Sequence, residues 1–206
     1  MSLLLKPEQL KPEKASMLTL VAALSVAFAI KEVCGLEAWI KWPNDIVVNN
    51  KKVCGILTEM SSEAECIHYV IIGIGINVNT KAFPAEISET ATSLYMEKER
   101  VNSAGQFQKN ETDRISRSCL TAAVLNYFET YYELFLQKSD LGFLLEEYNK
   151  MLINRDRQVK IADSSGAFTG IAKGINEQGE LLIETKDGLI EVCSGEVSVR
   201  GLYGYV

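Results

Sequence analysis

The chain has 206 residues, of which 47% are hydrophobic and 23% charged. This composition is typical of a globular protein with one large domain, or a medium domain and a small one, and it excludes a disordered or collagen-like chain. With 21 Lys and Arg against 27 Asp and Glu, the formal net charge is −6. General attraction to nucleic acid or to an anionic membrane is therefore not expected, although a local basic site is compatible with an acidic average.

The cysteines and the histidine narrow the chemistry further. The five cysteines are widely spaced and never form Cys-x-x-Cys, so neither a disulfide framework nor a zinc ribbon is expected, and the pattern favours a reducing cytoplasm. His68 is the single histidine, which excludes a site built from several histidines. Because acidic and apolar residues surround His68 on a strand-like segment, we interpret it as structural.

A long apolar run over residues 17–30 follows a segment that contains three lysines. The same order occurs in signal peptides. Pro12 and Glu13, however, are typical of the first turn of a helix, and the run is shorter than the roughly 20 residues of a membrane span. We therefore predict a nearly all-round apolar core helix over residues 13–33, with a signal peptide as the alternative.

The middle of the chain predicts further strands and helices. Residues 36–42 alternate like a strand, and residues 66–78 form a β-branched run typical of a central strand buried on both faces. Residues 84–108 are polar and irregular, which indicates a loop with a short helix. Apolar and aromatic positions at helical spacing predict helices over residues 111–137 and 141–152.

From residue 154 onward the chain consists of short β segments separated by turn residues. The segments are residues 159–161, 168–173, 180–185, 189–192 and 197–200. Five strands within about 50 residues predict a small barrel.

Residues 46–60 predict a β-hairpin. The segments Ile46-Val47-Val48 and Val53 to Met60 flank the pair Asn49-Asn50, which suits a two-residue turn with positive φ. In that register Val48 faces Lys51.

The same hairpin carries the chemically richest cluster. In the predicted register Val47 faces Lys52 and Asp45 faces Cys54, so Asp45 and Lys52 project from one side as diagonal neighbours about 7 Å apart. A carboxylate and an ammonium on one face suit a magnesium nucleotide, because the carboxylate can hold the metal and the lysine can neutralise charge on a phosphate. The alternative is an edge hairpin with solvated lysines.

Glycines alternate near the end of the predicted central strand, at Gly73 and Gly75. The segment is not Gly-x-Gly-x-x-Gly, because Val78 occupies the last glycine position, so a dinucleotide site is not predicted. Alternating glycines leave bare backbone on one face, where a flat ligand can lie close, and Asn77 is a candidate to hydrogen-bond a base edge. A close crossing of helix and sheet is the alternative.

Five segments, taken together and in this order, resemble bacterial biotin protein ligases. They are Lys-Trp-Pro-Asn-Asp at 41–45, Lys-Val-Cys-Gly-Ile-Leu-Thr-Glu at 52–59, Gly-Ile-Gly-Ile-Asn-Val-Asn at 73–79, Ala-Thr-Ser-Leu at 91–94 and Gly-Glu-Val-Ser-Val-Arg at 195–200. The resemblance implies an α+β fold related to class II aminoacyl-tRNA synthetases, with a mixed sheet and helices over residues 1–153. An SH3-like barrel is implied over residues 154–206.

The resemblance also implies a two-step reaction. The carboxylate of biotin attacks the α-phosphate of MgATP to give biotinoyl-5′-AMP, and a lysine of a biotin carboxyl carrier protein then attacks this mixed anhydride. ATP, magnesium and biotin are thus the implied ligands, and the carrier protein and a possible homodimer are the implied partners. A membrane partner is not expected, nor is DNA binding in the absence of a helix-turn-helix segment. A lipoate ligase-like protein is a weaker alternative.

The site residues carried over from the family fall into three groups. Lys52 is the implied catalytic residue, contacting the biotin carbonyl and the α-phosphate, and Asp45 is the implied magnesium ligand. Biotin or its adenylate is expected at Lys52, Gly55, Leu57, Gly73 and Gly75, the nucleotide at Lys41, Asn44, Asp45 and Asn77, and further contacts at Glu196 and Arg200 of the carboxy-terminal part.

Two family motifs do not occur in the 206 residues. Ligases of this family carry a Ser/Thr-rich strand that contacts biotin and a loop of the form Gly-Arg-Gly-Arg-Arg-Gly that folds over the ligands. Residues 1–7 resemble the strand that follows this loop. We therefore expect an amino-terminally truncated ligase with weak or no activity, because cationic donors and a lid that excludes water are absent. The alternative is a non-catalytic fragment that binds nucleotide or dimerises.

Overall fold

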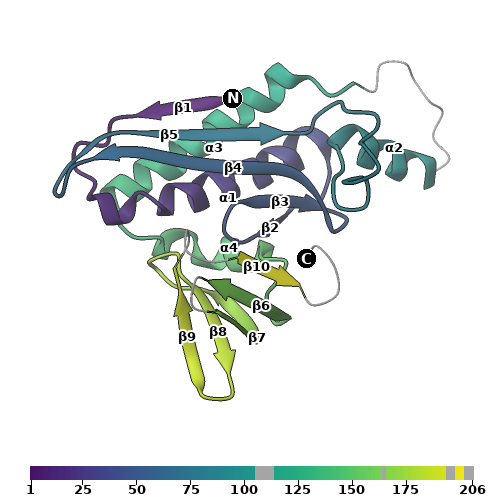
Figure 1. Cartoon of the computed structure of the whole chain (residues 1–206). Coiled ribbons are helices and arrows are strands. Elements are labelled where there is room, and N and C mark those ends of the chain that lie inside the picture. Colours follow the sequence, from purple (N-terminus) through teal and green to yellow (C-terminus); the bar gives the residue numbers. More distant parts are fainter. Residues whose placement is uncertain (105–113, 164–165, 194–197, 202–206) are drawn as a thin grey trace.

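The computed structural model describes residues 1–104, 114–163, 166–193 and 198–201. They form two antiparallel five-stranded sheets accompanied by helices (Figure 1). The first sheet has the order β1-β5-β4-β3-β2 and contains β1 (Ser2–Leu5), β2 (Trp39–Lys41), β3 (Asp45–Val48), β4 (Lys51–Ser62) and β5 (Ile67–Ile76). The second has the order β10-β6-β7-β8-β9 and contains β6 (Gln158–Asp163), β7 (Gly166–Ile175), β8 (Leu181–Thr185), β9 (Gly188–Val192) and β10 (Ser198–Gly201).

The helices that the structure describes are α1 (Met17–Cys34), α2 (Leu94–Ala104), α3 (Arg117–Lys138) and α4 (Leu145–Met151), with short 3-10 turns at Pro12–Lys14 and Gly142–Leu144. Three of these helices lie within the ranges that apolar periodicity predicts or within one residue of them, and the short helix expected in the polar segment 84–108 is α2. Together with the two sheets they confirm the expected α+β architecture, although the ladders of the first sheet are antiparallel rather than mixed within the described ranges.

Helix α1 contacts the first sheet on one side and α3 on the other. Toward the sheet, Thr19 donates a hydrogen bond to Oγ1 of Thr58 on β4 at 2.8 Å. Toward α3, the ring of Phe28 stacks on those of Tyr127 and Tyr131, with centroids 5.6 and 6.1 Å apart. Because α1 is covered on both sides, its apolar residues are buried around nearly the whole helix.

This burial bears on the two interpretations of the apolar run. Among the described residues, Pro12–Cys34 is the one helix that is long and apolar enough to cross a membrane, but 72% of its most apolar window is buried inside the fold. The burial is that of a core helix, as predicted. The helix is capped by Gly35, which has a φ of 67°. Its backbone N–H donates a hydrogen bond to the Lys31 carbonyl.

The helices cover one face of the first sheet and leave the other face open. On β4 and β5 the side chains that point toward the helices are buried, namely Cys54, Ile56, Val70, Ile72 and Ile74. The alternate positions, which include Gly55, Leu57, Gly73 and Gly75, are partly or fully exposed. The prediction of a strand buried on both faces is therefore wrong for β5. The glycines in its apolar run hid a regular alternation with period two.

The second sheet packs against the first part of the molecule through Trp42. The side chain of Trp42 is 1% exposed, and its indole N–H donates to the Gly179 carbonyl at 3.0 Å. The five predicted strands are present, but no ladder joins β9 to β10 within the described ranges, so the predicted barrel is an open sheet there.

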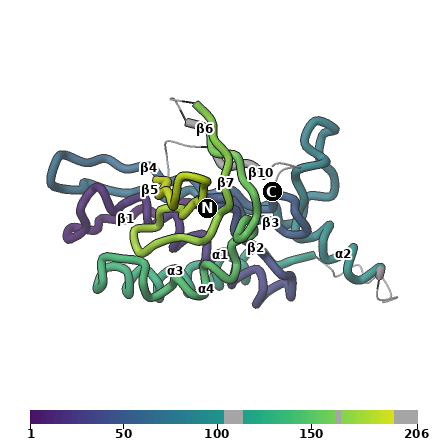
Figure 2. The backbone as a smooth tube through the Cα atoms, turned by 90° about the horizontal axis from the view of Figure 1, so that it is seen from below, coloured from purple at the N-terminus to yellow at the C-terminus, as the bar shows by residue number. Residues whose placement is uncertain are grey.

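Seen from below, α2 and the β4–β5 turn lie at opposite ends of the molecule (Figure 2).

Candidate functional site

The β3–β4 hairpin presents the charged residues of the candidate site. Asn49 and Asn50 have φ angles of 49° and 63°, as the predicted turn requires. Val48 pairs with Lys51 and Val47 with Lys52, also as predicted.

Beyond Val47 the register changes. Ile46 pairs with Cys54 and Asp45 with Gly55, so the prediction that Asp45 faces Cys54 is wrong. The cause is a β-bulge, in which Val53 is the extra residue on β4. Without a bulge, Lys52 and Gly55 would point to opposite faces, because side chains alternate along a strand. The bulge brings Lys52 to the open face of the sheet.

On that face Lys52 and Asp45 form an ion pair. Nζ of Lys52 lies 2.5 Å from Oδ1 of Asp45, and the two side chains are 39% and 15% exposed. A Cβ atom added at Gly55 would lie 3.1 Å from both Cε and Nζ of Lys52. The bare backbone of Gly55 therefore leaves the space through which Lys52 reaches across to Asp45.

An open cleft of about 490 Å³ adjoins this pair. Its lining residues are Met1, Asn44, Lys52, Gly55, Ile56, Leu57, Gly73, Ile74 and Gly75. The structure thus brings together all five residues expected at biotin or its adenylate, and adds Asn44 from the nucleotide group. Backbone groups fix Asn44, because its Nδ2 donates to the Ile56 carbonyl at 2.9 Å.

A second cleft, of about 260 Å³, continues from the first toward α1. It shares Asn44, Ile56 and Leu57 with the first cleft and adds, among others, Ser16 and Thr19 at the start of α1. Leu57 is 62% exposed where the two clefts meet. The two clefts are thus neighbours that share part of their lining.

Three residues of the nucleotide group, Lys41, Asp45 and Asn77, lie outside the lining of both clefts. Asp45 nevertheless forms the ion pair with Lys52, which lines the first cleft. Lys41 is 7% exposed on β2, directly opposite Asp45 in the sheet register. Asn77 follows the end of β5, and its Nδ2 donates to the Thr92 carbonyl at 3.2 Å. The positive charge of Lys41 is thus placed to act on Asp45. The side chain of Asn77 holds the segment that contains Thr92 and runs beside β4.

The side chains expected to make contacts in the carboxy-terminal part lie outside the described part of the chain. Glu196 lies outside the described residues. For Arg200 the structure describes the backbone, which pairs with Lys160 across β10 and β6, and the side chain lies outside the described part.

The thiol closest to the ion pair is not a nucleophile candidate. Cys54 is 1% exposed and points to the helix-covered face. Burial, and after it the negative charge of Asp45, raises the pKa of the Cys54 thiol to about 12. At neutral pH this thiol stays protonated, so the reactive groups of the open face are the ammonium and the carboxylate.

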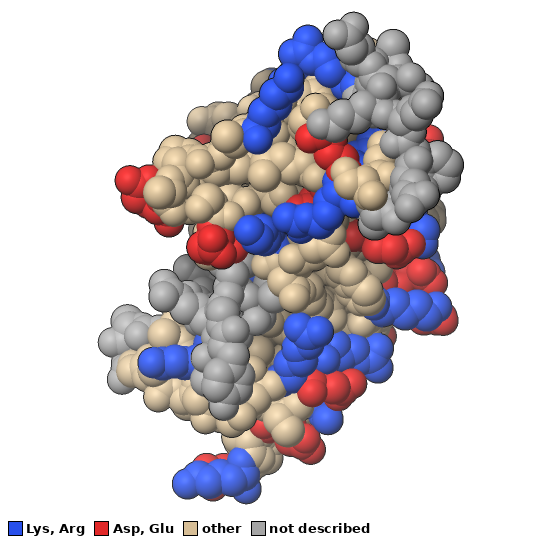
Figure 3. Space-filling model, turned by 90° about the vertical axis from the view of Figure 1, so that its right-hand side faces the viewer, with Lys and Arg blue, Asp and Glu red and all other residues tan. Residues whose placement is uncertain are grey.

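Within the described ranges, one group of three potential metal ligands lies close together. Glu63, Cys66 and His68 are exposed at the β4–β5 turn, with ligand atoms within 4.8 Å of one another. The turn is at the far end of β4 from Lys52. Figure 3 shows the opposite end of the molecule, where Lys and Arg side chains lie among acidic ones over the described surface.

Three residues near the Asp45–Lys52 ion pair were not predicted as functional: Asn49, Thr92 and Glu97. The segment at residues 90–92 runs beside the first residues of β4, since the Lys52 N–H donates to the Thr90 carbonyl at 2.8 Å and the Thr92 N–H donates to the Lys52 carbonyl at 2.9 Å. The sequence signal was the Ala-Thr-Ser-Leu motif at 91–94, which carries the family resemblance but offered no contact partner by itself.

Comparison with known proteins gives two family models that match this chain. The model described as "Biotin/lipoate A/B protein ligase family" matches residues 1–77, and the model described as "Biotin protein ligase C terminal domain" matches residues 156–200. The bifunctional ligase/repressor BirA of Bacillus subtilis (strain 168) is 36% identical over 203 residues, which is 97% of this chain and 57% of BirA. The chain thus spans a little more than half the length of this curated relative.

In the solved structures a larger share of the matched protein is covered. A crystal structure of the biotin protein ligase from Aquifex aeolicus has a TM-score of 0.81 and 32% identity, covering 97% of this chain and 80% of that chain. The Aquifex enzyme in complex with biotin and ATP has a TM-score of 0.80 at the same identity, covering 77% of that chain. Fold, motifs and both family models agree, and the chain belongs to the biotin protein ligase family.

Proposed function

We propose that this protein attaches biotin to a lysine of a biotin carboxyl carrier protein in an ATP-dependent reaction. The single observation that carries the proposal is the Lys52–Asp45 ion pair, which stands over Gly55 at the edge of a glycine-lined cleft. Membership of the ligase family and the likeness to a ligase structure that holds biotin and ATP support it.

In the first step a carboxylate oxygen of biotin would attack the α-phosphorus of ATP, and the bond to the leaving pyrophosphate would break. Negative charge grows on the α-phosphate oxygens as the two anions meet. The Lys52 ammonium lines the cleft and would stabilise that charge, which is the effect expected of a fixed cation at a phosphoryl centre. In the second step the carrier lysine amine would attack the acyl carbon, lose a proton and release AMP.

The neighbours of Lys52 would prepare it for this role. Asp45 holds the ammonium in one orientation before the substrates arrive, so less ordering remains for the reaction itself. Gly55, Gly73 and Gly75 present backbone without side chains, which permits close approach of a flat ligand. Lys41, buried opposite Asp45, would add positive potential.

The site also fits a magnesium ion. Mg²⁺ in nucleotide sites is usually held by one or two carboxylates together with phosphate oxygens and water, and Asp45 is a partly exposed carboxylate beside the cleft. We propose that Asp45 would hold the metal or its waters. When bound, the ion would neutralise part of the phosphate charge.

For the 206-residue polypeptide by itself we propose weak turnover, because its sequence contains no Gly-Arg-Gly-Arg-Arg-Gly loop to supply further cations and exclude water. We further propose a division into residues 1–153 and 154–206, cytoplasmic localisation and, as in the family resemblance, a homodimer.

The decisive experiment is transfer of labelled biotin to a carrier domain with ATP and magnesium. It would compare the 206-residue chain with the same chain extended at its amino terminus by the corresponding Aquifex ligase segment. We expect slow transfer by the former and fast transfer by the latter. If neither chain transfers biotin or binds a non-hydrolysable analogue of biotinoyl-5′-AMP, the proposal is wrong, and a nucleotide-binding or dimerising role becomes the better account.

A further inference from the structure

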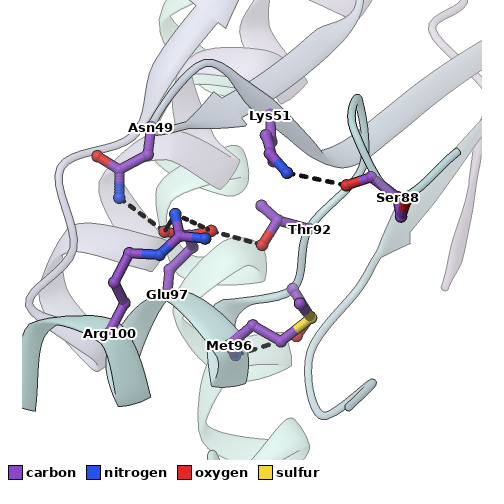
Figure 4. Close-up of polar contacts among 8 residues, drawn as sticks. Asn49, Lys51, Ser88, Thr92, Met96, Glu97 and Arg100 are labelled. Carbon is purple, nitrogen blue, oxygen red and sulfur yellow. Dashed lines mark hydrogen bonds and ion pairs between the residues drawn. The ribbon is translucent and has the colours of Figure 1, made fainter. Parts of the chain in front are cut away.

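A buried carboxylate lies next to the segment that carries Lys52. The side chain of Glu97, in the first turn of α2, is 0% exposed. Its Oε2 accepts a hydrogen bond from Nδ2 of Asn49 at 2.6 Å, and its Oε1 accepts one from Oγ1 of Thr92 at 2.5 Å (Figure 4). Arg100, one turn further along α2, contacts both oxygens at 3.0 and 3.2 Å.

These contacts explain how a buried charge is tolerated in the fold. Removing a carboxylate from water is strongly unfavourable unless other groups satisfy its oxygens. The hydroxyl of Thr92, the amide of Asn49 and the guanidinium of Arg100 together replace the lost hydration on both oxygens. Such a network is expensive to leave half formed, so its members hold one another in fixed positions.

Two of the partners lie on either side of Lys52. Asn49 is the first residue of the β3–β4 turn, three positions before Lys52. Thr92 belongs to the segment that pairs with Lys52, and its backbone N–H donates to the Lys52 carbonyl at 2.9 Å. Glu97 therefore joins the turn that leads into Lys52 to the chain that pairs with it.

This connection occurs where the sheet gives least support. The ladder between β4 and β5 begins at Cys54, which pairs with Ile76. At Lys52 the neighbouring strand has therefore ended, and the segment at residues 90–92 takes its place through an isolated parallel bridge between Lys52 and Ala91. The backbone of Lys52 depends on this short segment, which Glu97 in turn fixes.

We propose that Glu97 is a positioning residue for Lys52. By binding Asn49 and Thr92 at once, the carboxylate fixes the backbone from which the Lys52 side chain reaches the cleft. The significance for catalysis rests on the function proposed above for Lys52, whereas the effect on the backbone does not.

The backbone effect is measured by amide hydrogen exchange on the 206-residue chain. Glu97→Gln and Thr92→Val each keep the side-chain size but weaken the network. Glu99→Gln is the matched control, because Glu99 is two residues away on α2 and accepts a hydrogen bond from Tyr95 of the same helix at 2.8 Å. We expect exchange at the Lys52 and Thr92 amides to become about tenfold faster in the first two variants and to stay unchanged in the control. Unchanged exchange at Lys52 in Glu97→Gln would overturn the proposal.

The link to the ligand is measured by binding of a non-hydrolysable biotinoyl-5′-AMP analogue in a double-mutant cycle. We expect Glu97→Gln to weaken binding about tenfold in the wild-type background and by less than about twofold in the Lys52→Ala background, because its effect passes through Lys52. Equal losses in both backgrounds would show a general structural role and would contradict positioning. If Lys52→Ala itself leaves binding unchanged, the proposed function of Lys52 fails while the exchange result still decides the backbone claim.

A global loss of structure would mimic the expected result. The amide of Ile72, on β5 in the buried part of the sheet, reports on this. If exchange at Ile72 accelerates together with that at Lys52, Glu97→Gln has unfolded the chain. The exchange at Lys52 in Thr92→Val, which retains the carboxylate and its partner Arg100, then decides whether the network fixes the Lys52 backbone.

Discussion

The two faces of the first sheet are formed by the same strands but differ in burial and in the residues they carry. On β4 and β5, one set of alternate residues is packed under α1 and is nearly inaccessible, whereas the set between them forms the open face with its glycines and Leu57. The covered face is mostly apolar, with Thr58 hydrogen-bonded to Thr19 of α1. The open face bears the ion pair and the clefts. Side-chain alternation therefore separates stability from chemistry within single strands.

The bulge at Val53 interrupts the regular alternation of side chains along β4. It adds one residue to β4, and by that shift it delivers Lys52 to the open face beside Gly55. Substitutions on the open face should therefore affect the reaction more than folding, and substitutions on the covered face should do the opposite.

Lys52→Ala should have the largest effect. In the amino-terminally extended chain, biotin-dependent exchange of pyrophosphate into ATP should fall about 10²–10³-fold, the usual loss when one preorganised group at a developing charge is removed. The free energy of unfolding should change by no more than about 1 kcal/mol, because the ion pair is partly solvated. Lys51→Ala is the matched control, since Nζ of Lys51 binds the Ser88 carbonyl at 2.8 Å. Equal rates for both variants would remove Lys52 from its proposed role.

Ile72→Ala tests the covered face. Ile72 is 0% exposed under the helices, and truncating a buried isoleucine costs about 2–5 kcal/mol. Chemical denaturation should show that loss, and affinity for the biotinoyl-5′-AMP analogue should be retained under conditions where the variant is folded. The adjacent Ile71→Ala, on the half-buried open side, should cost clearly less. Similar losses at both positions would show that the two faces do not differ as described.

Gly55→Ala should have an intermediate and local effect. A methyl group would lie 3.1 Å from Cε and Nζ of Lys52, so the ammonium must move by a few tenths of an ångström. We expect a loss of about tenfold in pyrophosphate exchange, since displaced catalytic groups act less well, with little change in stability. Gly75→Ala is the control for the fold, because its added methyl would meet the Gly55 carbonyl at an ordinary 3.7 Å. Full pyrophosphate exchange by Gly55→Ala would show that the close fit of Lys52 over Gly55 is not needed for the reaction.

Local sequence signals predicted much of this arrangement. The Asn49-Asn50 turn, the core helix and the glycines of β5 follow from turn chemistry and periodicity, which are properties of adjacent residues. The bulge at Val53 has no such signal, because Lys-Lys-Val-Cys-Gly at residues 51–55 shows no alternation that would mark the position of an extra residue. The role of β5 was misjudged because glycine counts as apolar but buries no side chain.

The Glu97 network was beyond prediction for a different reason. Asn49 and Glu97 are 48 positions apart, and their contact depends on how the loop returns to the hairpin. No periodicity encodes such a meeting. The family motif at 91–94 marked the right segment, but the carboxylate that fixes it lies outside that motif.

The smallest effect concerns Cys54, on the covered face directly behind the site. Its thiol has a pKa of about 12 in the folded protein, against an ordinary value of 9.0, because burial disfavours the thiolate. Since the pKa is raised by folding, the unfolded chain gives up the proton first. The contribution to stability is complete below pH 9 and is lost as the pH rises toward 12. Between pH 8 and 9.5 the loss should amount to less than about 1 kcal/mol.

Cys54→Ala isolates that contribution. The variant should begin less stable, because it leaves a small cavity, but its free energy of unfolding should fall less steeply over the same pH interval. Denaturation curves at several pH values measure the difference between the two slopes, in which the other titrating groups cancel. Parallel slopes would mean that water reaches the thiol in the folded state, and the insulation that distinguishes the covered face from the open one would then be incomplete at its closest approach to Lys52.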